Sequence, residues 1–379
     1  MSATATAPLL PTYARQDVTF VRGEGSWLWD DAGRRYLDLF AGIAVVGLGH
    51  CHPAPVGAAV EQLRALWHVS NLYWTEPMQA LAHRLSERFG GAQAFFCNSG
   101  AEAVEAALKH ARKATGRSGV VALEGSFHGR TLGALSVTGQ PAKRAAFEPL
   151  LGGVSFVPLN DSDALAAAVG PETGAILLEP VQGEGGIHPV TPGFLAEARA
   201  LADERGALLV LDEVQTGVGR TGTFFAFEQL GVRPDVVTLA KGLANGLPIG
   251  CILVADDSAD GLAPGDHAST FGGNPVACAA ACAVCDELDE GLLAAVRRKA
   301  EFLSHGLAAL PGVVEVRGRG LLLAADVDAD ANELATAALA HGLVVGTAGP
   351  ATLRLTPPLT ISTEELVHGL ELLAEVLAA

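Results

Sequence analysis

The chain has 379 residues, of which 49% are hydrophobic and 18% charged, a composition typical of a globular protein with two domains or with one large domain and a smaller attachment. Its formal net charge of −17 argues against binding to nucleic acids or anionic membranes, because both attract basic surfaces. The longest apolar run, "VACAAACAVC" from Val276, is too short to span a bilayer, and the first residues lack the pattern of a secretory signal, so we expect a cytoplasmic protein.

The two ends of the chain differ in pattern from its middle. Residues 1–49 include "SWLWDDAGRRYLDLF", which predicts a β-hairpin around residues 31–33 followed by a short buried segment. After about residue 290 the pattern predicts a helix, short strands at "GLLLAADV" and "ATLRLTPPL", and a final amphipathic helix. We expect residues 1–49 and 291–379 to combine into a smaller α+β domain, with residues 50–290 as the large domain.

Between these ends, short apolar runs alternate with helical patterns, which is typical of an α/β domain with a largely parallel sheet. Two helices are predicted to end at Gly116 and Gly206, because glycine readily closes a helix. The predicted strands are Ala92–Cys97, Gly119–Glu124, Gly174–Glu179, Ala207–Asp212 and Val236–Ala240.

Polar and aromatic residues of unusual type follow these strands. In open parallel sheets, ligands bind just beyond the carboxyl ends of the strands, so this placement predicts a binding site. The residues are Ser99, Gly100, Phe127, His128, Arg130, Glu184, Asp212 and Lys241.

The first of these groups lies where a helix begins. Ser99 and Glu102 have the spacing of a capping box, and from this stretch alone a well-capped helix is the favoured interpretation. Capping is compatible with anion binding, because the free amides of Gly100 and Ala101 and the positive end of the helix dipole would also hold a phosphate.

Asp212 and Lys241 each end an apolar run. Asp212 could cap the following turn or, if partly buried, hold a proton on a heteroaromatic nitrogen. Lys241 could pair with an acid, but burial lowers the pKa of an amine and increases the fraction of free base that attacks aldehydes. Combined with a phosphate-binding helix start and the ring of Phe127, these residues indicate pyridoxal phosphate.

Three other patterns suggest different cofactors. "GVGRTG" matches the dinucleotide fingerprint of nicotinamide-dependent oxidoreductases, but it neither follows a strand directly nor precedes a good helix start. Cys278, Cys282 and Cys285 have the spacing of radical iron-sulfur enzymes, but the alanine and valine between them predict a packed helix. The histidines of "GHCHP" are more typical of a tight loop than of a metal site. We therefore assign no metal.

The motifs together resemble those of the class III (subgroup II) pyridoxal-phosphate aminotransferases, most closely their acetylornithine branch. The likeness covers nearly the whole chain and includes "CNSGAEAVEAALKHAR", "FHGRT", "LLEPVQGEGG", "LVLDEVQTGVGRTG", "LAKGLANGLPIG" and "STFGGNPVACAAA". It implies fold type I, with a mostly parallel seven-stranded sheet in the large domain, and a homodimer. It also implies transfer of the δ-amino group of N2-acetylornithine to 2-oxoglutarate in arginine biosynthesis. Relatives with the same catalytic residues act on ornithine, 4-aminobutyrate, succinyldiaminopimelate or carrier-protein-linked lysine.

The resemblance also implies roles for single residues. Lys241 would carry the cofactor and transfer protons, and Asp212 would bind the pyridine nitrogen. Phe127 would stack on the ring, and Gln215 would lie near its hydroxyl group. The other residues implied at the cofactor are Ser99, Gly100, Ala101, His128, Glu213, Val214 and Thr270.

Substrate choice is expected to depend on charged side chains. Arg130 would bind a carboxylate of N-acetylornithine and Arg354 one of glutamate, although the alternation around Arg354 alone favours a solvated strand face. Glu184 would neutralise Arg354 when the substrate presents no carboxylate there. The resemblance implies that Ser269 and Thr270 reach the site of the partner subunit, Ser269 toward substrate and Thr270 toward phosphate.

Overall fold

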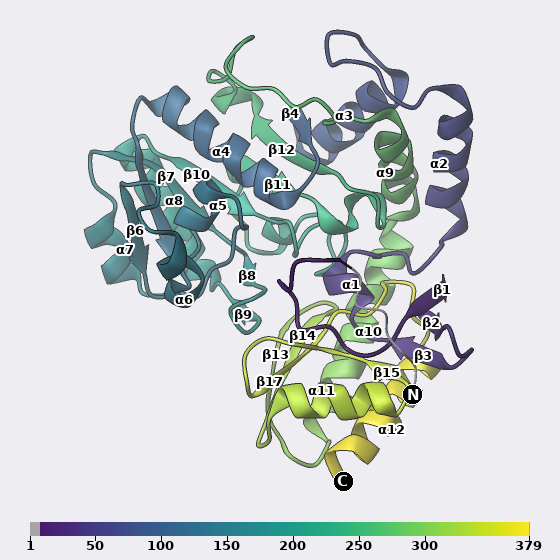
Figure 1. Ribbon diagram of the computed structural model, residues 1–379. Coiled ribbons are helices and arrows are strands. Elements are labelled where there is room, and N and C mark those ends of the chain that lie inside the picture. Colours follow the sequence, from purple (N-terminus) through teal and green to yellow (C-terminus); the bar gives the residue numbers. More distant parts are fainter. Residues whose placement is uncertain (1–7, 379) are drawn as a thin grey trace.

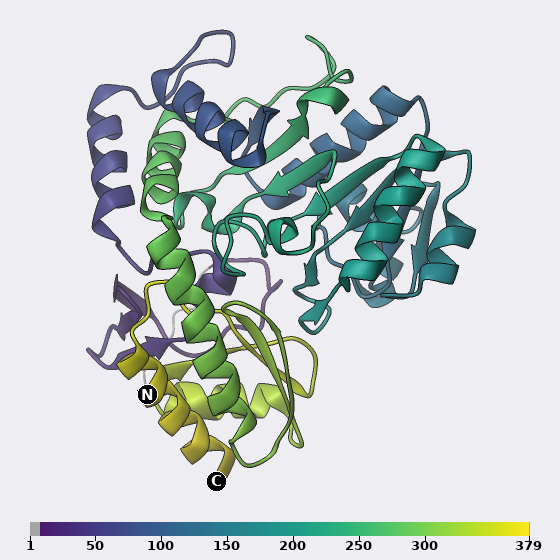
Figure 2. The same cartoon turned by 180° about the vertical axis from the view of Figure 1, so that it is seen from behind.

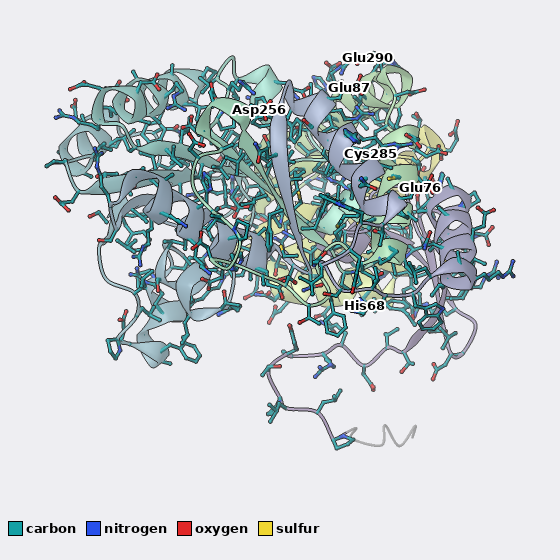
Figure 3. The ribbon with its side chains drawn as sticks, turned by 90° about the horizontal axis from the view of Figure 1, so that it is seen from above. His68, Glu76, Glu87, Asp256, Cys285 and Glu290 are labelled. Atoms are coloured by element: carbon teal, nitrogen blue, oxygen red, sulfur yellow. The ribbon has the colours of Figure 1, made fainter. Side chains whose placement is uncertain are left out.

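The protein is described over residues 8–378 by a computed structural model, which is shown from two opposite sides in Figures 1 and 2. A seven-stranded sheet with its helices forms the upper part of Figure 1, and strands from both ends of the chain form the lower part. The first described residues extend away from the rest of the molecule and are exposed (Figure 3).

The central sheet contains all five predicted strands, and each end differs from its prediction by at most one residue. Its order is β4 (Ala92–Cys97), β12 (Gly250–Ala255), β11 (Val236–Leu239), β10 (Leu208–Asp212), β7 (Thr173–Leu178), β5 (Gly119–Leu123) and β6 (Val154–Val157). β12 alone runs opposite to the other six strands of this sheet, and it pairs antiparallel with β4 and with β11. The carboxyl ends of β5, β7, β10 and β11 therefore lie along one edge, where ligands bind in such sheets.

Helices cover both faces of this sheet, and their ends follow local sequence signals. Ser99 caps α4 by accepting a hydrogen bond from the amide of Glu102 at 3.2 Å, and α4 and α8 end at Gly116 (φ 68°) and Gly206 (φ 64°), as predicted. The helices of this part and its connection are α1 (Ala41–Ala44), α2 (Pro53–Ala65), α3 (Glu76–Phe89), α4 (Gly100–Thr115), α5 (Leu132–Ser136), α6 (Pro141–Arg144), α7 (Ser162–Ala168), α8 (Pro192–Arg205) and α9 (Pro275–Glu287).

Two four-stranded sheets form the lower part. The predicted hairpin is confirmed, because β2 and β3 pair antiparallel on either side of a turn that contains residues 31–33. The first sheet has the order β1 (Phe20–Glu24), β2 (Trp27–Asp30), β3 (Arg35–Asp38) and β15 (Leu343–Val344), so both chain ends contribute to it. The second has the order β13 (Val313–Arg319), β14 (Leu322–Val327), β17 (Thr352–Leu355) and β16 (Gly346–Thr347). Helices α10 (Glu290–Ala308), α11 (Ala331–Ala340) and α12 (Thr363–Ala378) complete this part.

One hydrophobic cluster continues from the upper part into the lower part. It includes Leu239 of β11, Leu293 of α10 and Leu355 of β17, all nearly or fully buried. A continuous core fixes the two parts against each other at the edge of the central sheet. A small hairpin, β8 (Val181–Gln182) and β9 (His188–Pro189), also projects from the upper part toward the lower part (Figure 1).

The cysteines of "CAAACAVC" lie on α9, in the packed helix that the sequence predicts. Cys278 and Cys285 are buried in the hydrophobic cluster, and Cys285 is marked on its helix in Figure 3. Among residues 8–378, no group of three or more His, Cys, Asp or Glu side chains is arranged to hold a metal ion. None of the helices in the described part of the chain combines the length and hydrophobicity needed to cross a membrane.

Candidate active site

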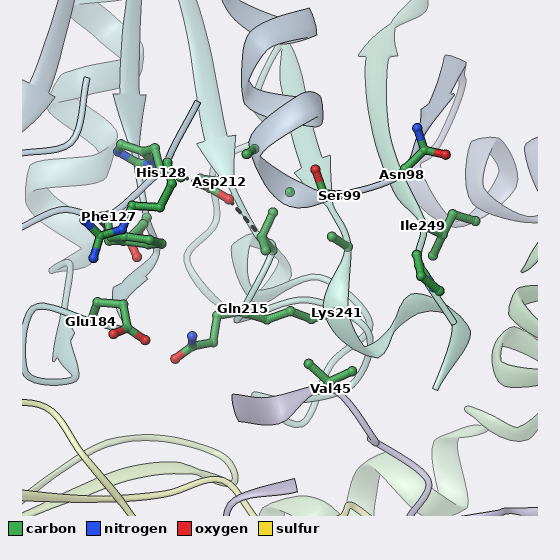
Figure 4. A pocket seen from close by; sticks show the side chains of 18 of the residues that line it. Val45, Asn98, Ser99, Phe127, His128, Glu184, Asp212, Gln215, Lys241 and Ile249 are labelled. Carbon is green, nitrogen blue, oxygen red and sulfur yellow. Dashed lines mark hydrogen bonds and ion pairs between the residues drawn. The ribbon is translucent and has the colours of Figure 1, made fainter. Parts of the chain in front are cut away.

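A cavity of about 430 Å³ lies beyond the carboxyl ends of the parallel strands (Figure 4). Its lining includes Phe127 after β5, Glu179 after β7, Asp212 at the end of β10 and Lys241 after β11. The cavity therefore lies at the edge of the sheet where the sequence predicts a binding site.

Lys241 follows β11 and begins a short 3-10 turn with a strained backbone. Its φ of 43° lies in the left-handed region, which residues other than glycine rarely adopt, and strain of this kind often occurs at functional sites. Burial lowers the pKa of its amine to about 8, and the nearby charge of Glu184 partly opposes this shift. Among residues 8–378, no hydrogen bond contributes to the shift. At this pKa about one tenth of the amine is free base at pH 7, far more than for an ordinary lysine.

Asp212 is almost fully buried and is held from three sides. Its Oδ2 lies 2.7 Å from Nδ1 of His128, and its Oδ1 accepts hydrogen bonds from Thr238 Oγ1 at 2.8 Å and from the amide of Val214 at 3.1 Å. Burial alone would lower the pKa of His128, but the hydrogen bond to Asp212 and the nearby carboxylates outweigh it and raise that pKa. The carboxylate thus has a fixed orientation beside a ring that favours its protonated form.

Glu179 is a cavity residue that the sequence interpretation missed. Its carboxylate accepts hydrogen bonds from the amide of Phe127 at 2.9 Å and from the amide of Gly183 at 3.1 Å. Burial raises its pKa to about 7, against the opposing charge of His128. The sequence contains a signal for this residue, because Glu179 is an acid that ends a predicted apolar strand, just as Asp212 is.

The start of α4 contributes backbone amides to the cavity. Gly100 and Ala101 line it, and as the first residues of a 16-residue helix their N–H groups have no partner in a preceding turn. A Cβ atom at Gly100 would lie 2.8 Å from Cγ1 of Val214, so this packing requires glycine. The amides and the helix dipole together form a site for an anion.

Gln215 leaves a polar atom without a partner at the cavity wall. The residue is 7% exposed, and within residues 8–378 its Oε1 accepts no hydrogen bond. A Cβ atom at Gly183 would lie 2.4 Å from this oxygen, so the glycine leaves it room. A buried acceptor of this kind is satisfied by a ligand that donates a hydrogen bond.

Two cations lie against the ring of Phe127. The guanidinium of Arg130 is 5.6 Å and the amine of Lys143 is 4.8 Å from the ring centre. Burial lowers the pKa of Lys143, which was not among the predicted site residues. Arg130 lines the cavity and Lys143 does not, so the positive charge of this wall comes mainly from Arg130.

Glu184 and Arg354 form an ion pair at the lower rim of the cavity. The Arg354 side chain is 4% exposed and lies over the ring of Phe40, with 5.2 Å from its guanidinium carbon to the ring centre. A solvated strand face at Arg354, which its alternating neighbours suggest, is therefore wrong. Burial would raise the pKa of Glu184, but the charge of Arg354 and their hydrogen bond lower it on balance.

Four of the predicted site residues do not belong to the lining of this cavity: Glu213, Ser269, Thr270 and Arg354. Arg354 is connected to it through its ion pair with Glu184, which does line it. Glu213 points away and accepts hydrogen bonds from the amides of Ala226 at 2.6 Å and Phe227 at 2.9 Å. Ser269 and Thr270 line a second cavity on the surface, although Asn98 of the first cavity donates a hydrogen bond to Ser269 Oγ at 3.2 Å.

The patterns that suggested other cofactors have local structural roles. "GVGRTG" folds into consecutive turns and opens no α-helix, and its Arg220 is buried and donates to the carbonyl of Leu321 at 3.0 Å and that of Pro357 at 2.5 Å. In "GHCHP", His50 bonds Asp38 at 2.7 Å, and the second histidine caps α2. Each pattern is explained without a ligand.

Comparisons with known proteins agree with this geometry. The family model described as aminotransferase class-III matches residues 12–377. An acetylornithine aminotransferase from Caldanaerobacter subterraneus is 48% identical over 98% of this chain and 97% of its own length, and one from Streptomyces coelicolor is 51% identical over 94% and 90%.

Solved structures give the same result for the fold. An ornithine aminotransferase from Toxoplasma gondii, described with partial occupancy of PLP at its active site, has a TM-score of 0.93 at 32% identity, covering 98% of this chain and 92% of its own. An N-acetylornithine aminotransferase from Stenotrophomonas maltophilia has a TM-score of 0.85 at 39% identity, covering 97% of both chains. The α/β fold of type I is confirmed, and the chain belongs to the class III aminotransferases.

Proposed function

We propose that this enzyme is a pyridoxal-phosphate-dependent aminotransferase that moves the δ-amino group of N2-acetylornithine to 2-oxoglutarate, giving N-acetylglutamate 5-semialdehyde and glutamate for arginine biosynthesis. The observation that carries the proposal is the buried amine of Lys241 in one cavity with the carboxylate of Asp212. The choice of substrate is supported by relatives at 48% and 51% identity that are named acetylornithine aminotransferases.

The residues of the cavity fit the proposed cofactor. The amides of Gly100 and Ala101 suit its phosphate, and the unsatisfied Oε1 of Gln215 suits its ring hydroxyl group. Asp212 would hold the pyridine nitrogen, and Phe127 would stack on the ring. When bound, pyridoxal phosphate supplies an aldehyde for the substrate amine and a ring that accepts electrons from the substrate carbon.

Lys241 and Asp212 divide the chemistry of transamination. Lys241 would hold the cofactor through its side-chain amine, and its Nζ, as the free base, would remove the proton from the substrate carbon that bears the amino group. A lowered pKa suits both steps, because both require the free base. The Asp212 carboxylate would keep the ring nitrogen of the cofactor protonated, and its hydrogen bonds with His128 and Thr238 hold the carboxylate in place.

The charged walls of the cavity would select the two substrates. Arg130 binds a carboxylate of N2-acetylornithine, and Lys143 beside it adds a second positive charge. Glu184 occupies Arg354 when this substrate is bound and releases it for a carboxylate of glutamate. If Glu184→Gln left both half-reactions unchanged, this switch would have to be abandoned.

A homodimer that shares its active sites completes the proposal. Large apolar side chains are exposed in residues 67–74 and in the loop that contains Ser269 and Thr270, and exposed apolar patches mark protein interfaces. They are Trp67, Leu72, Tyr73, Trp74 and Phe271, which are 69%, 86%, 65%, 80% and 61% exposed. Asn71 ties this segment to the loop by donating to the carbonyls of Ser269 at 2.9 Å and Gly272 at 2.8 Å.

Mixed dimers provide the test of a shared site. If Thr270 acts in the partner's cavity, mixing inactive Lys241→Ala chains with weakly active Thr270→Ala chains gives heterodimers in which both substitutions fall in one site. The other site is intact, so activity should recover on mixing. No recovery in heterodimers whose formation is verified by mass would place Thr270 in the cavity of its own chain.

A panel of half-reactions tests the substrate. The holoenzyme should lose its visible absorbance fastest with N2-acetylornithine, more slowly with ornithine, 4-aminobutyrate and succinyldiaminopimelate. Borohydride reduction followed by peptide mapping should find the pyridoxyl group on Lys241. If another amine reacts fastest, that amine is the substrate, whereas a label elsewhere would overturn the catalytic assignment.

The organisation of the chain and its location complete the set of proposals. Division into residues 1–49 with 291–379 and residues 50–290 would be tested by limited proteolysis, in which cuts should concentrate near the two boundaries. A cytoplasmic location would be tested by fractionation of the source cells.

A further inference from the structure

We propose that Arg317 is a positioning residue for substrate choice, because it fixes the hairpin that carries Glu184 against the sheet that carries Arg354. This inference deepens the proposed function and rests on its Glu184–Arg354 switch. Arg317 does not line the cavity, so it would act through Glu184 and not by touching a substrate.

The guanidinium of Arg317 connects two elements that come from distant parts of the chain. On its own sheet, Nη1 and Nη2 bond both carboxylate oxygens of Asp326, at 2.5 and 2.9 Å. Across to the β8–β9 hairpin, Nε donates to the carbonyl of Gly186 at 2.8 Å, two residues beyond Glu184. The planar fork leaves little freedom once two of its edges are engaged, so the hairpin backbone is fixed to β13 and β14.

The same network continues to Arg354. Thr352 and Arg354 are two residues apart on β17 and therefore lie on one face of the sheet. Thr352 lies opposite Asp326 of β14 and donates to its Oδ1 at 2.5 Å. The group of Arg317, Asp326 and Thr352 thus ties the hairpin that carries Glu184 to the strand that carries Arg354.

The hairpin has a conformation that needs support from outside. Ile187, fully buried, has a φ of 58°, and a β-branched residue in this region is a genuine outlier. Its side chain packs with Leu322 and Ala324 of the lower sheet, and Gly318 leaves it space, since a Cβ there would lie 3.1 Å from Ile187 Cγ2. Strain of this kind persists only where neighbouring contacts determine the backbone.

If the hairpin is fixed, the Glu184–Arg354 switch requires only the side chain of Glu184 to move. Glu184 must leave Arg354 when a glutamate carboxylate binds and must return to it when N2-acetylornithine binds. If the hairpin were free to move, Glu184 would meet Arg354 in many arrangements, and Arg354 would be neutralised less completely. Loss of Arg317 should therefore harm the N2-acetylornithine half-reaction more than the glutamate half-reaction.

A double-mutant cycle tests this coupling in the holoenzyme. For Arg317→Gln we expect the ratio of kcat/KM for N2-acetylornithine to kcat/KM for glutamate to fall about tenfold. Arg317→Lys keeps the positive charge but has a single donor nitrogen in place of the planar fork, so it should restore part of the ratio. In a Glu184→Gln background the same Arg317→Gln change should leave the ratio nearly constant. A merely structural role would instead lower both half-reactions equally, and would do so in both backgrounds, which would overturn the proposal.

Hydrogen exchange supplies a readout that does not depend on activity. Peptides covering residues 181–189 should exchange faster in Arg317→Gln than in the unsubstituted protein, and unchanged exchange would also overturn the proposal. Should Arg317→Gln fail to fold, Thr352→Val removes one bond to Asp326 and should shift the ratio in the same direction, by a smaller factor. If Glu184→Gln leaves the ratio unchanged, both the Glu184–Arg354 switch and the role of Arg317 are wrong. If Glu184→Gln changes the ratio but Arg317→Gln does not, only the role of Arg317 is wrong.

Discussion

The two sides of the cavity are built in different ways. Asp212 ends β10 of the central sheet, where Thr238 of β11 and the amide of Val214 and the ring of His128, from the segments after β10 and β5, hold it by hydrogen bonds. The Glu184–Arg354 pair instead joins a hairpin of the upper part to β17 of a second sheet.

This difference matches two chemical tasks. Every amino substrate needs the same proton transfer, which benefits from groups fixed in one rigid element. Two substrates of different shape need a site that changes, and a pair across two elements can open where a pair inside one sheet cannot. Substitutions on the Asp212 side should therefore alter the rate for all substrates, and those on the Glu184 side should alter the choice among them.

The largest effect is expected for Lys241→Ala. Removal of the only nucleophile and base proposed for the reaction should lower the rate of both half-reactions at least about 10⁴-fold, since no second group can take both roles. Single-turnover absorbance measurements check this for each substrate. A selective loss with one substrate would contradict the division between the two sides.

Asp212→Asn should follow in size. An amide cannot maintain the charge that keeps a ring nitrogen protonated, so kcat for both substrates should fall about 10² to 10³-fold while KM changes little. The comparison predicts equal factors for N2-acetylornithine and glutamate. Unequal factors in stopped-flow half-reactions would mean that Asp212 also acts in substrate choice.

Much of the fold and of the reactive side of the cavity follows from the sequence. Five strands of the central sheet are short apolar runs between helical patterns, and Asp212 and Lys241 stand out because a charged residue ends such a run. Strand β12 was missed because its apolar run follows a glycine-rich turn that resembles a loop, and β6 because it is short and only partly buried.

The side of the cavity that is proposed to select substrates is harder to predict from the sequence. Arg317 and Gly186 are separated by 131 positions, and nothing in either local pattern indicates that they meet. Lys143 lies in a short helix with no periodic signal, and its approach to Phe127 depends on how two loops pack. Contacts between elements are decided by tertiary packing, which local propensity and periodicity do not encode.

Glu179→Gln tests the rigid side through its pH dependence. The pKa of Glu179 in the folded protein, about 7, lies above its unfolded value of 4.5, so the folded state binds the extra proton between these values. The free energy of unfolding should therefore fall as pH rises from 4.5 to 7, by up to about 3 kcal/mol from this group. Glutamine does not titrate, so denaturation of the variant should lack this component; parallel curves for both proteins would show that Glu179 does not titrate in this range.

The smallest and most discriminating effect comes from a matched pair of threonines. Thr238→Val removes one hydrogen bond to Asp212, and Thr352→Val removes one to Asp326, so both lose the same hydroxyl group beside a carboxylate. A bond to a charged group contributes about 1.5 to 3 kcal/mol, but the other bonds to each carboxylate remain, so changes of about three- to tenfold are expected.

Thr238→Val should slow both half-reactions by the same factor, because it loosens a group that serves every substrate. Thr352→Val should mainly change their ratio, because it loosens the anchor of the pair that distinguishes them. The same effect from both substitutions would show that the two sides of the cavity form one mechanical unit.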